Sequence, residues 1–235
     1  MDRRATKSAL LIRLGNREVE YRFVRRRRRT LGITVGADGL KVSAPLRSPW
    51  RDIEGFVREK ERWILAKLDQ WAVAPRPAPL RGVTGETLPL CGEMVELEVR
   101  EGTGSVQRQG DRLVVSGMQR LVKWLKATAL EALQPRAAHF AALLGQPVPR
   151  VRLSNARTQW GVCTEDGVIR LSWRLVHIEP RLADYVVAHE SAHLVELNHS
   201  KRFWGLVARL YPGWREARAR LELAGTALPN FEGTT

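Results

Sequence analysis

The sequence lacks several features that identify common classes of protein. Its 235 residues include two cysteines, Cys91 and Cys163, which lie far apart and form no CxxC or CxxH pair. A zinc site built on cysteine is therefore not expected, and both thiols are expected to stay free in a reducing cytosol. No segment approaches the ~20 consecutive apolar residues of a membrane span, and no apolar segment of a secretory signal follows the basic N-terminus. These absences predict a cytoplasmic protein with no membrane contact.

Acidic residues are few relative to basic ones. The chain has 39 Lys and Arg residues against 25 Asp and Glu residues, a formal net charge of +14. A basic surface attracts phosphate backbones whatever their sequence, so contact with DNA is an open interpretation. Only seven of the basic residues are lysines, however, and a GC-rich genome produces the same bias. The run Arg25–Arg29 is the densest cluster, but on a strand its side chains would alternate between faces and form no single patch.

Histidine is also scarce, yet three of the five histidines lie within eleven residues. His189, Glu190 and His193 form an HExxH motif, and His199 follows six residues later. Positions i and i+4 share one face of a helix, so the imidazoles of His189 and His193 can converge on one metal ion. Glu190 would lie beside that ion, where a carboxylate can accept a proton from water. His199 is the candidate third ligand, which leaves one position of a tetrahedral zinc open, as in catalytic sites.

The neighbouring residues distinguish this pattern from a chance HExxH on a solvated helix. Residues 183–188 are apolar enough to be buried, and a buried histidine or glutamate is costly unless it is paired or binds a metal. Ser200 can cap a new helix directly after His199, so this histidine is expected at the corner between two helices. Glu196 is a weaker candidate for the third ligand, because on the same helix as His193 it would reach the same ion only with strain. We therefore expect one metal site, held by three imidazoles.

The proline-rich segment 74–79 is a stiff connector and the best candidate for a domain boundary. We expect an N-terminal region of β-strands and a helix over residues 1–80, and a catalytic domain over residues 81–235. The first region is expected to contain strands at residues 19–24, 31–35 and 40–44. A single helix of about twenty residues is expected to follow, from Trp50 to Trp71.

The second region has the order of elements expected of an α+β catalytic unit. Strands are expected at residues 94–99 and 112–115, followed by a long helix over residues 121–144 with an irregularity at Pro135. Further strands are expected at residues 151–153, 159–164 and 168–173, with a hairpin turn at Glu165-Asp166-Gly167. Pro180 can begin the HExxH helix. A hairpin before a metal-binding helix indicates the α+β class, and its edge strand could pair with an extended peptide.

Several blocks in this order resemble the YgjP-like metallopeptidase family, which is related to the SprT and WLM zinc peptidases. The resemblance covers roughly Tyr21 to Leu221. It rests on Arg28-Arg29-Thr30-Leu31, Phe56-Val57 with Lys60 and Trp63-Ile64, Thr158 with Trp160-Gly161 and Cys163, Leu171-Ser172-Trp173-Arg174-Leu175, Asp184-Tyr185-Val186-Val187 and Asn198-His199-Ser200-Lys201-Arg202-Phe203-Trp204. It implies a zincin-like catalytic fold, one zinc ion per chain held by His189, His193 and His199, and Glu190 as the general base.

Three residues depart from the pattern of that family. Where the family usually reads RWGSC, this chain has Gln159 in place of the arginine and Val162 in place of the serine. An arginine near the metal could stabilise a developing oxyanion, whereas Gln159 donates only neutral, weaker hydrogen bonds. Ser191 stands where the family usually has leucine. None of the three is a proposed ligand or base, so the departures concern the choice of substrate and the stabilisation of the transition state.

Gln159, Trp160 and Tyr185 are the candidate substrate-binding residues. Trp160 could line the cleft beside the hairpin, and Tyr185 could donate a hydrogen bond to an oxyanion, although core packing is the alternative for both aromatic side chains. Asp184 could orient a ligand histidine from behind, or it could face solvent near the start of its helix. His139 and His177 have no supporting context and are interpreted as ordinary polar residues.

These residues predict a zinc-dependent hydrolase, and a metallopeptidase that acts on protein or peptide substrates is the leading hypothesis. Glu190 would accept a proton as water attacks a carbonyl polarised by the metal, and would then pass it to the leaving amine. A zinc-dependent nucleotide pyrophosphohydrolase is the first alternative, although the chain has no P-loop or other glycine-rich phosphate cradle. A zinc-containing DNA-binding protein without hydrolytic activity is the second alternative.

Overall fold

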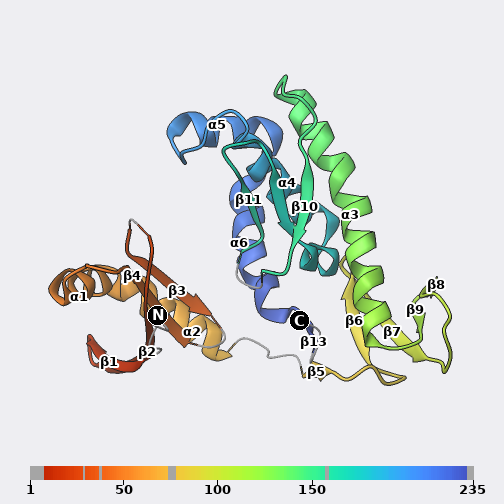
Figure 1. Ribbon diagram of the computed structural model, residues 1–235, viewed down its shortest axis with the longest axis horizontal. Coiled ribbons are helices and arrows are strands. Elements are labelled where there is room, and N and C mark those ends of the chain that lie inside the picture. The colour runs from red at the N-terminus through yellow and green to blue at the C-terminus, as the bar shows by residue number, and fades with distance from the viewer. Residues whose placement is uncertain (1–7, 29, 37–38, 74–77, 157–158, 232–235) are drawn as a thin grey trace, which may run out of the picture. The chain divides into compact units, whose positions relative to one another are not determined.

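A computed structural model of the chain describes residues 8–28, 30–36, 39–73, 78–156 and 159–231. Its contacts divide the chain into two compact units, Met1–Arg76 and Pro77–Thr235 (Figure 1). Each unit has a hydrophobic core of its own. The division falls within the proline-rich connector, a few residues before the boundary expected at residue 80. That the two units are separate functional domains stays a prediction. No described helix is both long and apolar enough to cross a membrane.

The first unit is a four-stranded sheet with two helices. Its strands are β1 (Ser8–Leu14), β2 (Arg17–Arg26), β3 (Gly32–Gly36) and β4 (Gly39–Pro45), in the spatial order β1-β2-β4-β3. Strands β2 and β4 are parallel, and the two outer pairs are antiparallel. Leu14, Val42, Ile53 and Ile64 are fully buried between the sheet and the helices α1 (Trp50–Glu59) and α2 (Glu61–Val73). Strand β1 was not predicted.

The single helix expected from Trp50 to Trp71 is wrong, because the chain forms two helices. Lys60 ends α1 with φ −95° and ψ 11°, and its backbone N–H bonds to the carbonyl groups of Arg58 and Val57. Both helices still bury an apolar residue in the core of the unit, Ile53 from α1 and Ile64 from α2. The apolar stripe therefore continues from α1 into α2, and for this reason the sequence pattern alone did not reveal the break between the two helices.

The arginine run at the end of β2 is partly structural. Arg25 donates from Nη1 to the carbonyl oxygens of Pro45, Leu46 and Ser48 at 3.1, 3.1 and 2.8 Å. Its guanidinium group also lies over the rings of Phe23 and Trp50. Arg25 therefore ties β2 to the segment after β4. Arg29 lies outside the described residues, and contact of this run with DNA stays a prediction.

The second unit begins with a four-stranded sheet, in the order β6-β7-β9-β8, and one long helix. The strands are β6 (Thr87–Leu90), β7 (Glu93–Val99), β8 (Gln107–Gln109) and β9 (Arg112–Val115), and the helix is α3 (Met118–Leu143). Helix α3 contains Pro135 without ending there, because Leu133 and Ala137 on either side are buried in the core. Two short strands, β5 (Pro79–Leu80) and β13 (Asn230–Phe231), pair in parallel.

A three-stranded sheet and three helices carry the HExxH motif. The sheet has the order β10-β12-β11 and consists of β10 (Val151–Ser154), β11 (Gly161–Cys163) and β12 (Ile169–Ser172), so β11 is an edge strand. Strands β11 and β12 form the predicted antiparallel hairpin. A 3₁₀ helix, Trp173–His177, leads to α4 (Pro180–Ala192). Two further helices follow in the chain, α5 (Lys201–Leu210) and α6 (Trp214–Ala224). Helix α4 contacts α3, β11 and α6 (Figure 1). This mixture of helices and small sheets confirms the α+β class.

Candidate metal centre

The HExxH residues lie where α4 ends and the chain turns towards α5. His189 and Glu190 are in the last turn of α4, and His193 is its C-cap residue, with φ −68° and ψ −15°. The chain then leaves the helix, passes His199, and begins α5 at the N-cap residue Ser200, whose Oγ accepts a hydrogen bond from the backbone of Phe203 at 3.2 Å. The predicted corner between two helices at His199 is confirmed.

The three histidines converge on one point. One ring nitrogen from each of His189, His193 and His199 lies within 4.8 Å of the other two. The Nε2 atoms of His189 and His199 are 3.2 Å apart. Two ligands of a tetrahedral zinc, each at about 2.0–2.1 Å from the ion, are separated by about 3.3 Å, so this spacing fits a shared metal. Among the described residues, these three histidines are the group that could hold a metal ion.

The hydrogen-bonding state of the imidazoles also suits metal binding. The Nδ1 atom of His193 lies 3.0 Å from the carbonyl oxygen of Glu196, to which it can donate, and this leaves Nε2 as the unprotonated ligand atom. The Nδ1 atom of His189 is buried and has no partner among the described atoms. Burial first, then the neighbouring histidines and Arg218, lower the pKa of His189 to about 4. A neutral imidazole is the form that binds a metal.

Phe203 packs against all three imidazoles, a role that the sequence analysis did not assign. Its ring centroid lies 4.9 Å from that of His189, 4.4 Å from that of His193 and 4.7 Å from that of His199. The side chain is fully buried, and the ring of Trp204 lies 5.7 Å from His189 and 5.8 Å from His199. Helix α5 therefore supports the histidines with two aromatic side chains. The signal in the sequence was the pair of aromatic residues one turn after His199.

Glu196 does not take the place considered for it in the sequence. The expectation that it lies on the same helix as His193 is wrong, because α4 ends at Ala192. The carbonyl oxygen of Glu196 accepts from His193, and its carboxylate lies 4.0 Å from Nε of Arg202. No glycine or proline marks the end of α4, so the sequence alone did not show this boundary.

Glu190 is buried beside the histidines and close to the edge strand β11. Its side chain is 6 % exposed, and it accepts a hydrogen bond from the backbone of Cys163. Burial raises the pKa of Glu190 to about 7, and the bond from Cys163 opposes that rise. A Cβ atom placed on Gly161 would come within 2.5 Å of Cγ of Glu190. The absence of a side chain at Gly161 therefore makes room for this carboxylate, a second role that the sequence analysis missed.

The three candidate substrate-binding residues differ in their environments. Gln159 is exposed, two residues before β11 begins. Trp160 is partly buried and packs against the hydrophobic core, close to Gly225 after α6. Tyr185 is buried in α4, with its ring 6.2 Å from His189 and 5.9 Å from Tyr211. Contact with a substrate stays a prediction for each of them.

Asp184 has neither of the two environments considered for it. Its carboxylate pairs with the guanidinium group of Arg136 on α3, and it is only partly exposed. Burial raises the pKa of Asp184, and the charge of Arg136 opposes the rise. This ion pair connects α4 with α3. The two residues are far apart in the sequence, so sequence spacing does not reveal their contact. His177, interpreted as an ordinary polar residue, is buried, and its Nδ1 atom lies 2.7 Å from the carbonyl oxygen of Pro89.

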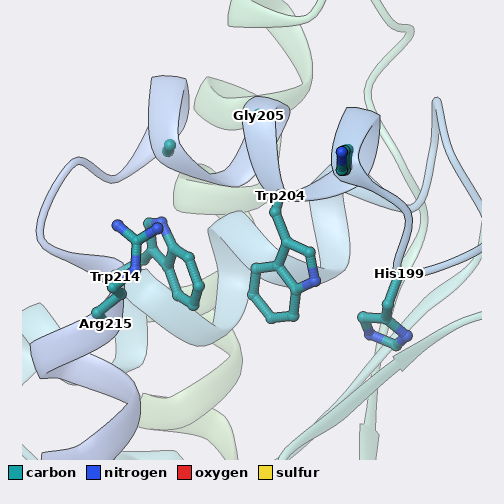
Figure 2. A pocket seen from close by; sticks show the side chains of 7 residues that line it. His199, Trp204, Gly205, Trp214 and Arg215 are labelled. Atoms are coloured by element: carbon teal, nitrogen blue, oxygen red, sulfur yellow. The ribbon is translucent and has the colours of Figure 1, made fainter.

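A pocket of about 500 Å³ opens next to the histidine cluster (Figure 2). His199 lies at one end of it, and the rest of its lining comes from α5 and the start of α6. The site therefore combines three convergent imidazoles, a buried carboxylate and an adjoining hollow. Such an arrangement can hold a metal ion and act on a molecule bound beside it.

Comparison with known protein families agrees with this geometry. A family model described as YgjP-like, metallopeptidase domain, matches residues 29–224. The chain belongs to the YgjP-like metallopeptidase family. The match to the YgjP-like domain covers part of the first compact unit, most of the second, and all three histidines. No curated protein matches the chain. Among solved structures, the chain is similar to a crystal structure of the metallopeptidase zymogen of Pyrococcus abyssi abylysin, with 25% identity and a TM-score of 0.38. The similarity covers 42% of this chain and 98% of that one.

In this YgjP-like domain, Val162 and Ser191 are two residues that differ from the pattern that the resemblance implies. Val162 is exposed on the edge strand β11. Ser191 is fully buried in α4, and its hydroxyl group has no hydrogen-bond partner among the described atoms. A hydroxyl stands there where the resemblance implies an apolar side chain, and nothing in the structure explains this residue. Thr158, one of the residues that carry the resemblance, lies outside the described residues.

Proposed function

We propose that the chain is a zinc-dependent peptidase in which His189, His193 and His199 hold one zinc ion and Glu190 is the general base. The observation that carries the proposal is the convergence of the three imidazoles, whose ligand atoms lie within 4.8 Å of one another beside a buried glutamate. Membership of a metallopeptidase family supports a hydrolase that acts on protein or peptide substrates.

The donor set favours zinc over a harder cation. Three neutral imidazoles suit zinc, whereas calcium and magnesium bind oxygen ligands. Three protein ligands also leave a coordination position open, which distinguishes a catalytic zinc from a structural one. When bound, zinc would polarise a peptide carbonyl and make a water molecule a stronger acid.

The residues of the chain then have separate tasks. The carboxylate of Glu190 accepts the proton from the attacking water and delivers it to the nitrogen of the leaving amine. Gly161 leaves space for that carboxylate against β11, and the backbone N–H of Cys163 holds it. The bond between His193 and the carbonyl of Glu196 keeps Nε2 of this histidine available to the metal.

The edge position of β11 supports a peptide substrate. One side of β11 pairs with β12, and in the described part of the chain no strand pairs with its other side. An extended peptide can add to such an edge through main-chain hydrogen bonds. Helix α4, which contacts β11, carries His189 and Glu190, so a peptide on this edge would lie beside Glu190. We infer that α4 and this sheet form a zincin-like unit.

Metal analysis with two variants tests the proposal. The purified protein is expected to contain about one zinc per chain and to lose it on His189→Ala, because two imidazoles bind too weakly. Glu190→Gln is expected to retain zinc and to lose hydrolysis of an unstructured protein, because the amide accepts no proton. His139→Ala removes an exposed histidine outside the cluster and serves as the matched control. Hydrolysis that continues unchanged in Glu190→Gln would contradict the mechanism.

The same preparations separate the peptidase from its alternatives. Unstructured proteins and nucleoside triphosphates are incubated with the enzyme, each with and without a chelator. Cleavage of the triphosphate alone would indicate a pyrophosphohydrolase. DNA binding that survives removal of the metal, together with no hydrolysis of either substrate, would indicate a binding protein.

A further inference from the structure

The pocket beside His199 has a consistent chemical character. It is lined by His199, Lys201, Trp204, Gly205, Ala208, Trp214 and Arg215 (Figure 2). Two of these residues are cationic, two are tryptophans, and none is acidic. Since His199 is a proposed zinc ligand, whatever occupies the pocket lies next to the reacting bond.

Two stacked tryptophans form one wall of the pocket and hold arginine side chains. The rings of Trp204 on α5 and Trp214 on α6 are stacked, with centroids 4.4 Å apart and planes inclined by 21°. The guanidinium group of Arg215 lies 4.6 Å from the centroid of Trp214, and that of Arg218 lies 5.6 Å from the centroid of Trp204. A guanidinium group that lies on an aromatic face is restrained in position. Its N–H groups point outward in its own plane and stay available for hydrogen bonds.

The basic residues in and beside the pocket differ from the neighbouring Arg220, which is paired with a carboxylate. Arg220, also on α6, donates to both carboxylate oxygens of Glu179 at 2.7 Å. Within the described parts of the chain, Lys201, Arg215 and Arg218 form no ion pair with an acidic residue.

We propose that this pocket binds a carboxylate of the substrate beside the scissile bond, so that the enzyme prefers peptides with an acidic side chain or a free C-terminus there. The proposal rests on the proposed peptidase function. Arg215 offers parallel N–H donors that match a carboxylate, and Lys201 adds a second positive charge. A nucleic acid fits less well, because the two rings are stacked on each other and also carry guanidinium groups, so little ring face remains for a nucleobase.

Paired peptides test the preference. One series carries a single Glu, or Gln in its place, at successive positions on either side of the cleaved bond. A second series compares a free C-terminal carboxylate with its amide, and so distinguishes the two sources of the carboxylate. At one position, the acidic peptide is expected to have a kcat/KM about tenfold higher than its neutral partner, the scale of a charge-assisted hydrogen bond.

Variants assign the preference to the pocket. Arg215→Gln should reduce the ratio of the two kcat/KM values towards one, and Arg215→Glu should reverse it in favour of a peptide with Lys at that position. Arg220→Gln removes an arginine of the same helix that is already paired with Glu179, and should keep the preference of the unaltered enzyme. Circular dichroism and zinc content confirm that each variant is folded. The Kd of labelled peptides for the Glu190→Gln protein, measured by fluorescence anisotropy, should follow the same order without cleavage.

Each outcome supports or contradicts a defined statement. If the enzyme cleaves both peptides of every pair equally, the carboxylate pocket is overturned and the peptidase function stands. If it cleaves no peptide at all, the proposed function fails, and the pocket proposal fails with it. If the preference survives in Arg215→Glu, another part of the protein causes it. If Arg215→Glu abolishes binding of a single-stranded oligonucleotide but leaves the peptide ratio unchanged, the pocket serves a nucleic acid instead.

Discussion

At the scale of single residues, Gly161 determines whether Glu190 can reach its position. The side chain of Glu190 passes against the backbone of β11, where a Cβ at residue 161 would lie 2.5 Å from Cγ and 2.7 Å from Oε1 of this glutamate. Cγ is near the base of the side chain and cannot swing away as a free end could. Glycine is therefore required at residue 161 because it leaves room for the side chain of Glu190, and not because of a strained backbone conformation.

Gly161→Ala is expected to lower kcat by about ten- to a hundredfold, because a displaced general base is misaligned with the attacking water. Zinc content is expected to stay at that of the unaltered protein, since the substitution adds no contact with the histidines. Steady-state kinetics together with metal analysis checks both expectations. Gly104→Ala is the control, because a Cβ at that position meets no atom within 4 Å. Equal activity in the two variants would show that Glu190 needs no such space.

At the scale of secondary structure, the corner between α4 and α5 brings together the residues of the proposed metal site. Helix α4 supplies His189 and Glu190, its C-cap residue is His193, and the segment after it supplies His199. Helix α5 then places Phe203 against all three imidazoles. The site therefore depends on where α5 begins, and Ser200 determines that point through its bond to the backbone of Phe203.

Ser200→Ala is expected to lower the free energy of unfolding by about 1 kcal/mol, the usual contribution of an N-cap side chain. Zinc affinity should also decrease, because the first turn of α5 holds Phe203 against the imidazoles. Denaturant unfolding and a competition assay with a zinc indicator measure the two effects. Ser200→Asp restores a capping oxygen and should recover both quantities. A loss of zinc affinity that Asp does not recover would assign the effect to something other than the cap.

At the scale of the whole molecule, the chain consists of two units with separate cores, and the family match extends into both of them. The second unit contains every residue of the proposed metal site and the pocket beside it. Its core also encloses His177, which is 2 % exposed and lies against Trp173 and Phe231. Burial, opposed by the bond to Pro89, lowers the pKa of His177 to about 4.

This buried histidine predicts that acid destabilises the second unit. Between about pH 6.5 and pH 4 the unfolded chain binds a proton at His177 and the folded chain does not, so the free energy of unfolding falls as the pH falls. Above that window the contribution is fully present. Over the whole window the loss amounts to about 3 kcal/mol, from about 1.4 kcal/mol for each pKa unit between 6.5 and about 4.

His177→Asn isolates this contribution, because asparagine can still donate to the carbonyl of Pro89 but does not titrate. Urea unfolding of the metal-free protein at several pH values checks the expectation, since other histidines contribute equally to both proteins. The stability of the variant should depend less steeply on pH than that of the unaltered protein. Parallel curves from the two proteins would show that His177 is not responsible.

Much of the chemistry could be predicted from local sequence. The i and i+4 spacing of His189 and His193 specifies a shared helix face, and Ser200 is a helix cap that requires no tertiary information. The hairpin before α4 followed from turn residues, and it was confirmed. Strand β1 was missed because its apolar residues do not alternate clearly, and only pairing with β2 shows which of them are buried. The break at Lys60 was missed because the apolar pattern continues across it.

The sequence by itself determined the set of candidate ligands, the candidate base and the α+β class, because spacing along a helix and the chemistry of imidazole and carboxylate groups are local properties. Only the tertiary structure decided that α4 ends before Glu196, that Asp184 pairs with Arg136, and that Gly161 faces Glu190. It also brought Trp204 and Trp214 together over the pocket at His199. These contacts join residues whose distance in the folded chain depends on how helices and strands pack, and no spacing in the sequence encodes that distance.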